Sequence, residues 1–280
     1  MPELPEVETI ANGVHARVQG QRIVGVWTSG KPQTFKSPEA EIAAALTGAT
    51  IESVRRVGKT IVMTLTRTAK KKLSQVEFLI HLGMTGRLLV SAPDVPVPPH
   101  THAILTLADA REIRFVDPRR FGRLSIHQPV TDNQQPATYS GPGREPLTIS
   151  LDDFAALFHG RKTPIKAALL NQSLLHGVGN IYADEALFRG GIRPTRHAGR
   201  LTRAELTRLR TALQTVLKRA IKLGGSSVSD YVDADGMRGY FQIEHKVYGR
   251  EAEPCTVCGK PIKKITLAGR GTHYCPTCQH

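Results

Sequence analysis

The four cysteines of the chain lie near its C-terminus and form two short-spaced pairs. Cys255 and Cys258 make one C-x2-C pair, and Cys275 and Cys278 make a second pair sixteen residues later. Thiolates at this spacing can surround one Zn²⁺ tetrahedrally. A disulfide framework fits less well, because small disulfide-rich scaffolds spread their cysteines along the chain. Four thiolates close the coordination sphere, so we expect one structural zinc ion that takes no part in chemistry.

The N-terminal residues 2–6, PELPE, point to a different chemistry. If Met1 is removed, Pro2 presents a secondary amine, and an α-amino pKa near 8 leaves a fraction of it neutral at pH 7. A neutral amine can attack an aldehyde-like sugar carbon and form an iminium ion. Glu3 and Glu6 are candidates for proton transfer beside it. An ordinary helix start with its capping residues is the alternative interpretation.

The charge of the chain is strongly positive. Its 280 residues include 38 Lys and Arg against 24 Asp and Glu, and 38 − 24 gives +14. Such an excess favours a polyanionic partner, above all nucleic acid, although a merely basic surface is the alternative. No stretch approaches the ~20 consecutive apolar residues of a membrane helix, and the acidic start does not resemble a secretory signal. We therefore expect a cytoplasmic protein with no membrane association.

The elements that must position these residues change in type along the chain. Apolar residues in 5–18 follow a helical period, and Gly20 suits the end of that helix. Short segments rich in β-branched and aromatic residues follow, separated by turn signals. These predicted strands are 23–27, 51–54, 61–65, 76–80, 103–107 and 112–115. Many short strands at this spacing indicate a β-sandwich or a β-barrel.

The second half of the chain is helical in pattern. Short helices are predicted at 151–160 and 165–170, and Thr202 and Glu205 form a capping box before a long apolar stripe. We expect an α+β chain with two main domains. The predicted divisions are a β-sandwich domain with an N-terminal helix at 1–133, a linker at 134–146, a helical domain at 147–241 and a zinc hairpin at 242–280.

Six motifs occur in a fixed order along the whole chain. They are MPELPEVETI at the start, Gly58-Lys59, the segments 81–86 (HLGMTG), 117–122 (DPRRFG) and 178–185 (VGNIYADE), and Gly269-Arg270-Gly271 before the last cysteine pair. With these motifs the chain resembles the bacterial formamidopyrimidine-DNA glycosylase / endonuclease VIII family. Leu4 favours the formamidopyrimidine branch, because relatives that excise oxidised pyrimidines more often begin with Pro-Glu-Gly.

The resemblance implies a bifunctional DNA glycosylase and AP lyase of base excision repair. Such an enzyme flips out and excises oxidised purines, including 8-oxoguanine and formamidopyrimidines, and then cleaves the strand by β,δ-elimination. It implies double-stranded DNA with oxidised bases as the partner, a monomer and a place at the bacterial nucleoid. Two alternatives stay open at this point: an oxidised-pyrimidine glycosylase of the same family, and a zinc-containing DNA-binding protein without catalysis.

The resemblance also assigns catalytic roles to individual residues. Pro2 would be the nucleophile on C1′ of the damaged nucleotide, and Glu3 the general acid or base that helps to open the deoxyribose. Lys59 would contact the phosphate next to the lesion. Arg270, between two glycines in the zinc hairpin, would place its guanidinium on a phosphate. The family's helical DNA-binding element is a helix–two-turns–helix motif, which the 147–241 domain would contain.

Further DNA contacts follow from the same resemblance. Met84, Arg119 and Phe121 would fill the void left by the flipped base, with Arg119 facing the opposite cytosine; core packing is the alternative for Met84 and Phe121. Asn180, read as the N-cap of a helix after a Gly-rich turn, would grip a phosphate, whereas a cap without a ligand is the alternative. The remaining expected contacts are His81, His100, Lys166 and Arg120.

The resemblance assigns no definite role to two further features of the sequence. Residues 224–241 resemble the family's recognition loop over the flipped base, but Ser229 stands where many relatives have Lys or Arg. Glu185 falls on a carboxylate of the family motif, and the sequence does not say what it does.

Overall fold

The computed structural model describes residues 1–280 except 70–71, 129–130, 133–134, 137 and 228–230. Its contacts divide the chain into two compact units. Met1–Ser140 with Gly224–Gly239 form one, which we call the strand unit, and Gly141–Leu223 with Tyr240–His280 form the other, the helical unit. The sequence analysis placed the loop 224–241 in the helical domain, whereas the structure groups Gly224–Gly239 with the strands.

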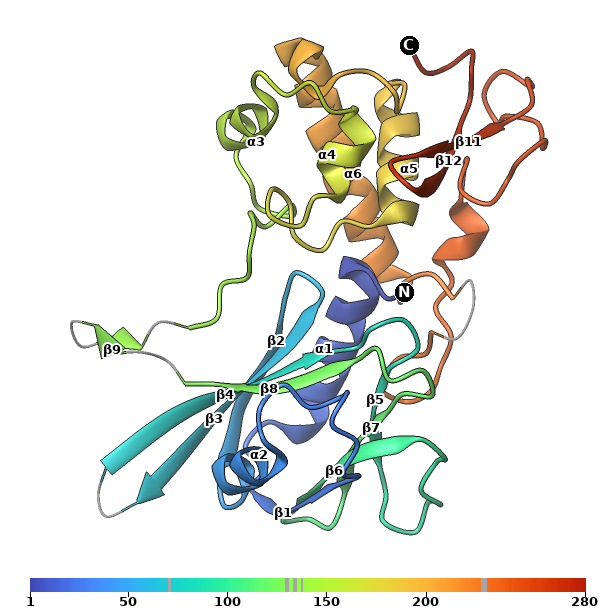
Figure 1. The fold of residues 1–280 in the computed structure, drawn as a ribbon. Helices are drawn as coiled ribbons and strands as arrows, with labels where there is room; N and C mark the ends of the chain where they lie inside the picture. Colours follow the sequence, from blue (N-terminus) through green and yellow to red (C-terminus); the bar gives the residue numbers. More distant parts are fainter. Residues whose placement is uncertain (70–71, 129–130, 133–134, 137, 228–230) are drawn as a thin grey trace. The chain divides into compact units, whose positions relative to one another are not determined.

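The strand unit contains two four-stranded antiparallel sheets (Figure 1). One has the order β1-β6-β7-β5 and the other β2-β3-β4-β8. The strands are β1 Ile23–Thr28, β2 Thr50–Val57, β3 Thr60–Ala69, β4 Lys72–His81, β5 Arg87–Ser91, β6 Thr101–Leu107, β7 Glu112–Val116 and β8 Arg123–His127, with a small extra pair, β9 Thr131–Asp132 and β10 Gln135–Pro136. This arrangement confirms the predicted N-terminal β domain.

Helix α1, Leu4–Val18, packs against both sheets of the strand unit, contacting β2 and β3 of one and β5 of the other. Val7, Ile10, Val14 and Val18 recur at helical spacing, and all four are fully buried in the core. Burying each such side chain contributes roughly 1.5–3 kcal/mol. The helix is thus fixed in place, and residues 2 and 3 are held directly before its first turn.

The helical unit is built on two packed helices, α5 and α6. Its elements are α3 Leu151–Phe158, α4 Ile165–Leu170, α5 Asn180–Gly190, α6 Arg203–Lys222, the 3₁₀ turns Ala198–Arg200 and Phe241–Glu244, and the hairpin β11 Lys263–Leu267 with β12 Arg270–Tyr274. The predicted capping box of α6 is confirmed: Glu205 N–H donates to Thr202 Oγ1 (3.3 Å), and Thr202 N–H donates to Glu205 Oε2 (2.8 Å).

We examined the helices for segments that could cross a membrane. Within the part of the chain that the structure describes, none of them combines the length and the apolar composition that a span requires.

Candidate functional site

The N-terminal residues are packed into the strand unit at the start of α1. Pro2 and Glu3 are buried, whereas half of the Met1 surface is exposed. Glu3 N–H donates to Glu6 Oε2 (2.8 Å). The N-terminal end of α1 carries partial positive charge, which favours an anion and a neutral amine nearby. The site expected for an amine nucleophile is therefore buried, lies at the N-terminal end of a helix and is bordered by two carboxylates.

Glu6 also holds the base of the loop that the sequence analysis interpreted as a recognition loop. Its Oε1 accepts the N–H of Ser226 (2.7 Å), and its carbonyl accepts the Tyr231 hydroxyl (3.4 Å). Burial raises the pKa of that hydroxyl, and the negative charge of Glu6 raises it further. The loop 224–239 is thus anchored on the helix that carries Pro2. Ser229 lies outside the described residues.

Lys59 and His81 lie near each other, Lys59 in a turn and His81 at the end of a strand. Lys59 is in the turn before β3, and Thr60, the residue after it, pairs with His81 at the end of β4. Burial lowers the pKa of His81, and the charges of Lys59 and Arg123 lower it further. The Nδ1 atom of His81 accepts the N–H of Gly83 (3.1 Å), which leaves the proton of a neutral ring on Nε2. His81 can therefore offer a neutral N–H donor beside the Lys59 cation.

Asp117 organises the loops that carry the expected void-filling residues. Its carboxylate is fully buried and accepts the Thr85 hydroxyl (2.6 Å) and the N–H groups of Gly122 (2.7 Å) and Arg119 (3.3 Å). The N–H of Asp117 donates to the carbonyl of His100 (3.0 Å). Asp117 therefore ties together three loops, one of them through its backbone N–H. The sequence analysis quoted Asp117 within a motif but gave it no role, because its partners are set only by the fold.

Met84, Arg119 and Phe121 come together on the exposed side of these loops. Met84 is 41% exposed and Phe121 46% exposed, so neither is a core side chain. The Arg119 guanidinium lies 4.7 Å from the centre of the Phe121 ring. A Cβ at Gly83 would lie 2.5 Å from the backbone carbon of Phe121, which shows how closely the two loops pack. Two apolar side chains and a cation thus form one exposed group.

His100 and Arg120 lie in the same loop system and share an unusual backbone. Both are exposed and adopt positive φ values, 65° and 55°, a region that non-glycine residues seldom occupy. Backbone strain of this kind persists where surrounding contacts impose it. Asp117 supplies such contacts, since its N–H donates to His100 and its carbonyl accepts the N–H of Arg120 (3.2 Å).

The four cysteines converge as predicted. Their Sγ atoms all lie within 4.8 Å of one another, with Cys255 to Cys278 at 3.9 Å and Cys258 to Cys275 at 3.4 Å. A tetrahedral zinc with Zn–S bonds of about 2.3 Å requires sulfur atoms about 3.8 Å apart. Backbone N–H groups of Val257 and Cys278 donate to the thiol sulfurs of Cys255 and Cys275 (3.4 Å each). The donor set and its spacing fit one structural zinc ion.

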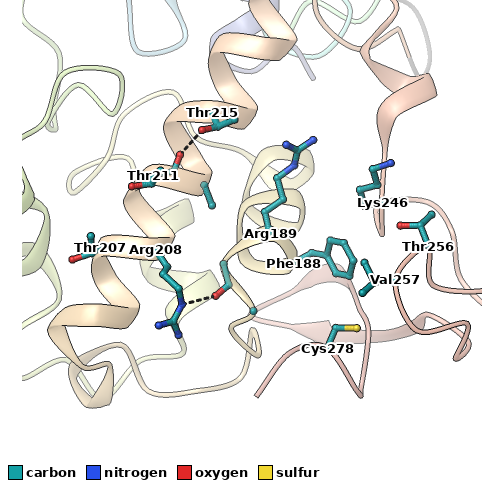
Figure 2. Close-up of a pocket in the computed structure, with 13 residues that line it drawn as sticks. Phe188, Arg189, Thr207, Arg208, Thr211, Thr215, Lys246, Thr256, Val257 and Cys278 are labelled. Carbon is teal, nitrogen blue, oxygen red and sulfur yellow. Dashed lines mark hydrogen bonds between the residues drawn. The ribbon is translucent and has the colours of Figure 1, made fainter.

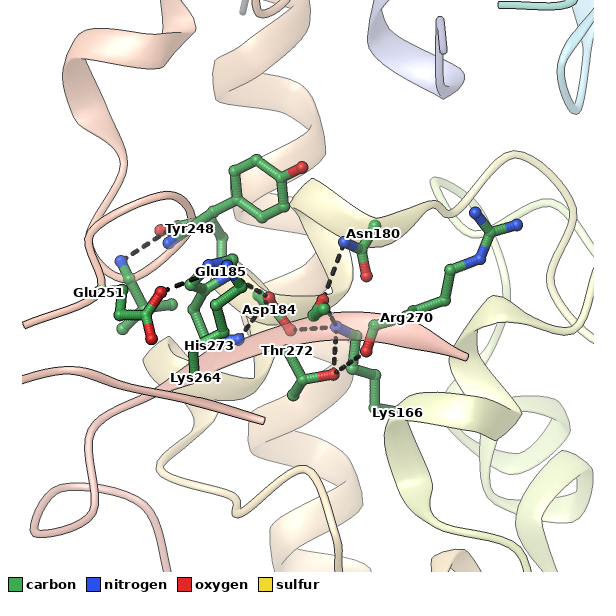
Figure 3. Close-up of polar contacts among 12 residues, drawn as sticks. Lys166, Asn180, Asp184, Glu185, Tyr248, Glu251, Lys264, Arg270, Thr272 and His273 are labelled. Carbon is green, nitrogen blue, oxygen red and sulfur yellow. Dashed lines mark hydrogen bonds and ion pairs between the residues drawn. The ribbon is translucent and has the colours of Figure 1, made fainter. Parts of the chain in front are cut away.

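The helix that carries Asn180 meets the zinc hairpin (Figure 3). The structure places Gly179, not Asn180, at the N-cap, and α5 begins at Asn180. Because Gly179 is the N-cap, the Asn180 side chain does not cap the helix. Its Nδ2 instead donates to the carbonyl of Gly271 (3.0 Å). Arg270, the neighbour of Gly271, is exposed at the start of β12. Asn180 and Arg270 are therefore brought together on one face of the helical unit.

Lys166, which the sequence analysis expected to contact DNA, is buried in the helical unit. Its side chain is about 1% exposed, and the ammonium contacts Asp184 Oδ1 (2.7 Å), the carbonyl of Gly271 (2.9 Å) and Thr272 Oγ1 (2.8 Å). Figure 3 shows these contacts between α4, α5 and the hairpin. The Lys166 ammonium thus contacts other groups of the protein and is buried.

Glu185 binds a backbone segment that is distant in the sequence, which the sequence analysis did not predict. Its buried carboxylate accepts the backbone N–H groups of Lys246, Val247 and Tyr248, all at 2.9–3.0 Å. Burial raises the pKa of this carboxyl, while the three N–H donors act in the opposite direction. Glu185 therefore connects helix α5 to the segment that leads into the zinc loop, by which we mean the loop before β11 that carries Cys255 and Cys258.

A cavity of about 910 Å³ in the helical unit is lined by none of the predicted catalytic residues (Figure 2). It opens between the end of α5, helix α6 and the zinc loop, beside Cys278. Among the described residues that line it there is no carboxylate, and its charged groups are Arg189, Arg208 and Lys246. It lies at the opposite end of α5 from Asn180, about 15 Å along the helix axis.

Comparisons with known proteins cover the whole chain. Family models match residues 1–124 (formamidopyrimidine-DNA glycosylase N-terminal domain), 142–232 (formamidopyrimidine-DNA glycosylase H2TH domain) and 252–280 (zinc finger found in FPG and IleRS). Formamidopyrimidine-DNA glycosylases of Symbiobacterium thermophilum and Gluconobacter oxydans are each 42% identical, over 100% of this chain and 89% and 100% of theirs.

Solved structures agree with these matches. The MutM (Fpg) protein from Thermus thermophilus has a TM-score of 0.84 at 42% identity, covering 99% of this chain and 98% of its own. A Lactococcus lactis Fpg in complex with DNA that contains an abasic site has a TM-score of 0.84 at 30% identity, covering 99% of each chain.

Proposed function

Since the chain belongs to the formamidopyrimidine-DNA glycosylase family, we propose that its reaction starts at Pro2, once Met1 has been removed. The family comprises DNA glycosylases of base excision repair with AP lyase activity, and DNA is the partner of this chain. One observation carries the proposal: Pro2 and Glu3 are buried at the N-terminal end of α1, where the Glu6 carboxylate accepts the N–H groups of Glu3 and of Ser226 at the base of the loop 224–239.

The proposed chemistry uses only groups of the chain and the substrate. The neutral Pro2 amine attacks C1′ of the damaged nucleotide, the bond from C1′ to the base breaks with its electron pair going to the base, and the proton that the Pro2 nitrogen loses goes to the departing base. Glu3 protonates the ring oxygen O4′ as the sugar opens to an iminium ion. The iminium acidifies the C2′ proton, whose loss expels the 3′ phosphate, and a second elimination expels the 5′ phosphate. The zinc ion holds the hairpin and takes no part in these steps.

Flipping the base out of the helix is assigned to the exposed group of Met84, Arg119 and Phe121. Unstacking a nucleotide costs a few kcal/mol. Apolar side chains inserted into the gap offset part of this cost, and a guanidinium can hydrogen-bond to the orphaned base. The 41% and 46% exposure of Met84 and Phe121 supports this role, since exposed apolar side chains of this size are available to a partner.

Phosphate recognition is assigned to both units. Lys59 and the neutral N–H donor of His81 lie together in the strand unit, and Asn180 and Arg270 lie together in the helical unit. His100 and Arg120 are proposed as further contacts, because both are exposed in the loops that Asp117 organises. We do not assign a DNA contact to Lys166, whose ammonium is buried.

The wider organisation follows the same proposal. The substrate is duplex DNA with oxidised purines, and the enzyme acts as a monomer at the nucleoid in the cytoplasm. The working divisions are a catalytic domain at 1–133, a linker at 134–146, a DNA-binding helical domain at 147–241 with the recognition loop 224–241, and the zinc hairpin at 242–280.

Excision assays on defined duplexes test this function. Duplexes that contain 8-oxoguanine opposite cytosine should lose the base and be cleaved, whereas thymine glycol duplexes should react far more slowly. Faster excision of thymine glycol would place the chain in the oxidised-pyrimidine branch. Binding without cleavage of either duplex would contradict an enzymatic role.

A further inference from the structure

Two helices of the helical unit hold the same backbone carbonyl of the zinc hairpin. The carbonyl of Gly271 accepts one hydrogen bond from Lys166 Nζ on α4 (2.9 Å) and one from Asn180 Nδ2 at the start of α5 (3.0 Å). Gly271 directly follows Arg270, whose guanidinium is exposed. The hairpin is therefore fixed at the residue next to its exposed cation, well away from the cysteines at its other end.

The Lys166 ammonium is buried among groups of the protein. It donates hydrogen bonds to the Gly271 carbonyl and to Thr272 Oγ1, and it forms an ion pair with Asp184 Oδ1 at 2.7 Å. The other oxygen of Asp184 accepts the backbone N–H of His273 (2.9 Å). The buried pair of Lys166 and Asp184 thus holds consecutive residues of β12, from 271 to 273.

A buried ion pair is a poor means of gaining stability alone. Desolvation of the two charges offsets much of their attraction, and a hydrophobic pair of similar size is often as stable. What the charged pair provides here is geometry, because each partner directs its hydrogen bonds to particular atoms of the hairpin. Because these hydrogen bonds are made directly beside Arg270, they fix the position of that residue in the hairpin.

We propose that Lys166 is a positioning residue, which with Asp184 holds β12 so that Arg270 meets a DNA phosphate. The inference rests on the proposed role of Arg270 and goes beyond it by assigning the alignment to the buried pair. It replaces the direct DNA contact that the sequence suggested for Lys166. Zinc fixes one end of the hairpin, and the pair fixes the other.

A double-mutant cycle on DNA affinity, measured over a range of salt concentrations, tests the proposal. Arg270→Ala should remove one phosphate contact, so the slope of log affinity against log salt falls by about one. Lys166→Met should lower the slope by a similar amount while zinc content stays at one ion per chain. The double variant Lys166→Met/Arg270→Ala should lose no more than Arg270→Ala alone. Lys218→Met, which removes an exposed lysine of α6, is the matched control and should leave the affinity almost unchanged.

Thr272→Val keeps the experiment decisive if Lys166→Met fails to fold. It removes the hydroxyl that accepts from Lys166 Nζ (2.8 Å) and donates to the carbonyl of Arg270 (3.2 Å), and it should give a partial loss of affinity that disappears in the Arg270→Ala background. Additive losses in both cycles would overturn the positioning role while leaving the phosphate role of Arg270 intact. An unchanged slope in Arg270→Ala alone would refute the proposed function of Arg270, and the inference with it.

Discussion

At the scale of single residues, buried polar groups hold in place the exposed groups to which we assign DNA contacts. Asp117 is the clearest case in the strand unit, since its carboxylate fixes the backbone at Arg119 and the loop that carries Met84. Each hydrogen bond to a buried carboxylate contributes about 1.5–3 kcal/mol. The side chain of Arg119 is then free to interact with DNA, although its backbone is fixed.

The role of Arg119 can be tested by its effect on the opposite base. Arg119→Ala should reduce the preference for 8-oxoguanine opposite cytosine over adenine by roughly tenfold, because a directed contact to a base discriminates by ~1–3 kcal/mol. Excision rates on the two duplexes provide the measurement. Arg111→Ala, which removes a cation paired with Asp109 in a surface turn, is the control for net charge. Full discrimination in Arg119→Ala would mean that another residue reads the opposite base.

His245 makes the stability of the helical unit depend on pH. Burial lowers its pKa to about 4 from 6.5, and its ring lies between those of Phe241 and Tyr248. As the pH falls below 6.5, His245 becomes protonated in the unfolded chain but stays neutral in the folded protein. The folded protein therefore loses stability between pH 6.5 and pH 4. The free energy of unfolding should therefore fall by about 2 kcal/mol less between pH 7 and pH 5 in His245→Phe than in the unsubstituted protein.

Denaturant unfolding at those two pH values, with zinc in excess, measures this difference. Zinc release in acid affects both proteins alike, so only the difference between them reports on His245. Equal pH dependence in the two proteins would show that the histidine is not the responsible group.

At the scale of elements, helix α1 and the loop 224–239 act as one assembly. Gly225 has φ +82°, and a Cβ there would lie 2.9 Å from Glu6 Oε1, within the contact that anchors the loop. Gly225→Ala should thus displace the loop base and slow excision of 8-oxoguanine by tenfold or more, since strain of this kind costs on the order of 1–3 kcal/mol. Cleavage of an abasic duplex has no base to recognise and should change little.

A second glycine of the same loop gives a matched control for this prediction. Gly236 has φ +79°, but a Cβ there would have no described atom within 4 Å. Gly236→Ala carries the same backbone strain without the collision. If both variants slow excision equally, the contact with Glu6 is not what matters.

The elements were predictable where a local pattern sets them. The stripe of α1, the capping box of α6 and the β-branched segments of β3 and β4 lie close to their predicted positions. Helix α2, Glu39–Leu46, was not predicted, because it buries only two side chains, Ile42 and Leu46, and has no side-chain cap. Strands β5 and β8, of five residues each, were also missed.

The site was predictable as a set of residues but not as a set of contacts. Motifs identified the cysteines, and the structure confirms their convergence. The bond from Ser226 to Glu6 spans 220 residues, and the one from Lys166 to Thr272 spans 106. No local pattern encodes such pairs. For the same reason the sequence could not distinguish a buried Lys166 from one on the surface.

At the scale of the whole molecule, each unit has its own core and the zinc serves only one of them. Val247, Ile262 and two of the cysteines pack with Phe188 in the helical unit. Replacing Cys255 and Cys258 by serine should release zinc and lower DNA affinity by at least tenfold, because the hairpin that carries Arg270 loses its anchor.

The strand unit should remain folded in that variant. Its β1 carries Trp27, the single tryptophan of the chain, whose fluorescence reports on this unit alone. Bound zinc, DNA affinity and tryptophan emission are the three measurements. Undiminished DNA binding by the metal-free protein would contradict the account of the hairpin.

The central claim, that the Pro2 amine forms a covalent link to the sugar, is tested most directly by borohydride trapping. Mass spectrometry first identifies protein that begins at Pro2 and protein that retains Met1. The account predicts that the first, on a duplex with 8-oxoguanine opposite cytosine, gives one stable protein–DNA adduct, joined through the Pro2 nitrogen. The second should give none. No adduct from the processed protein, or equal adducts from both forms, would contradict the claim.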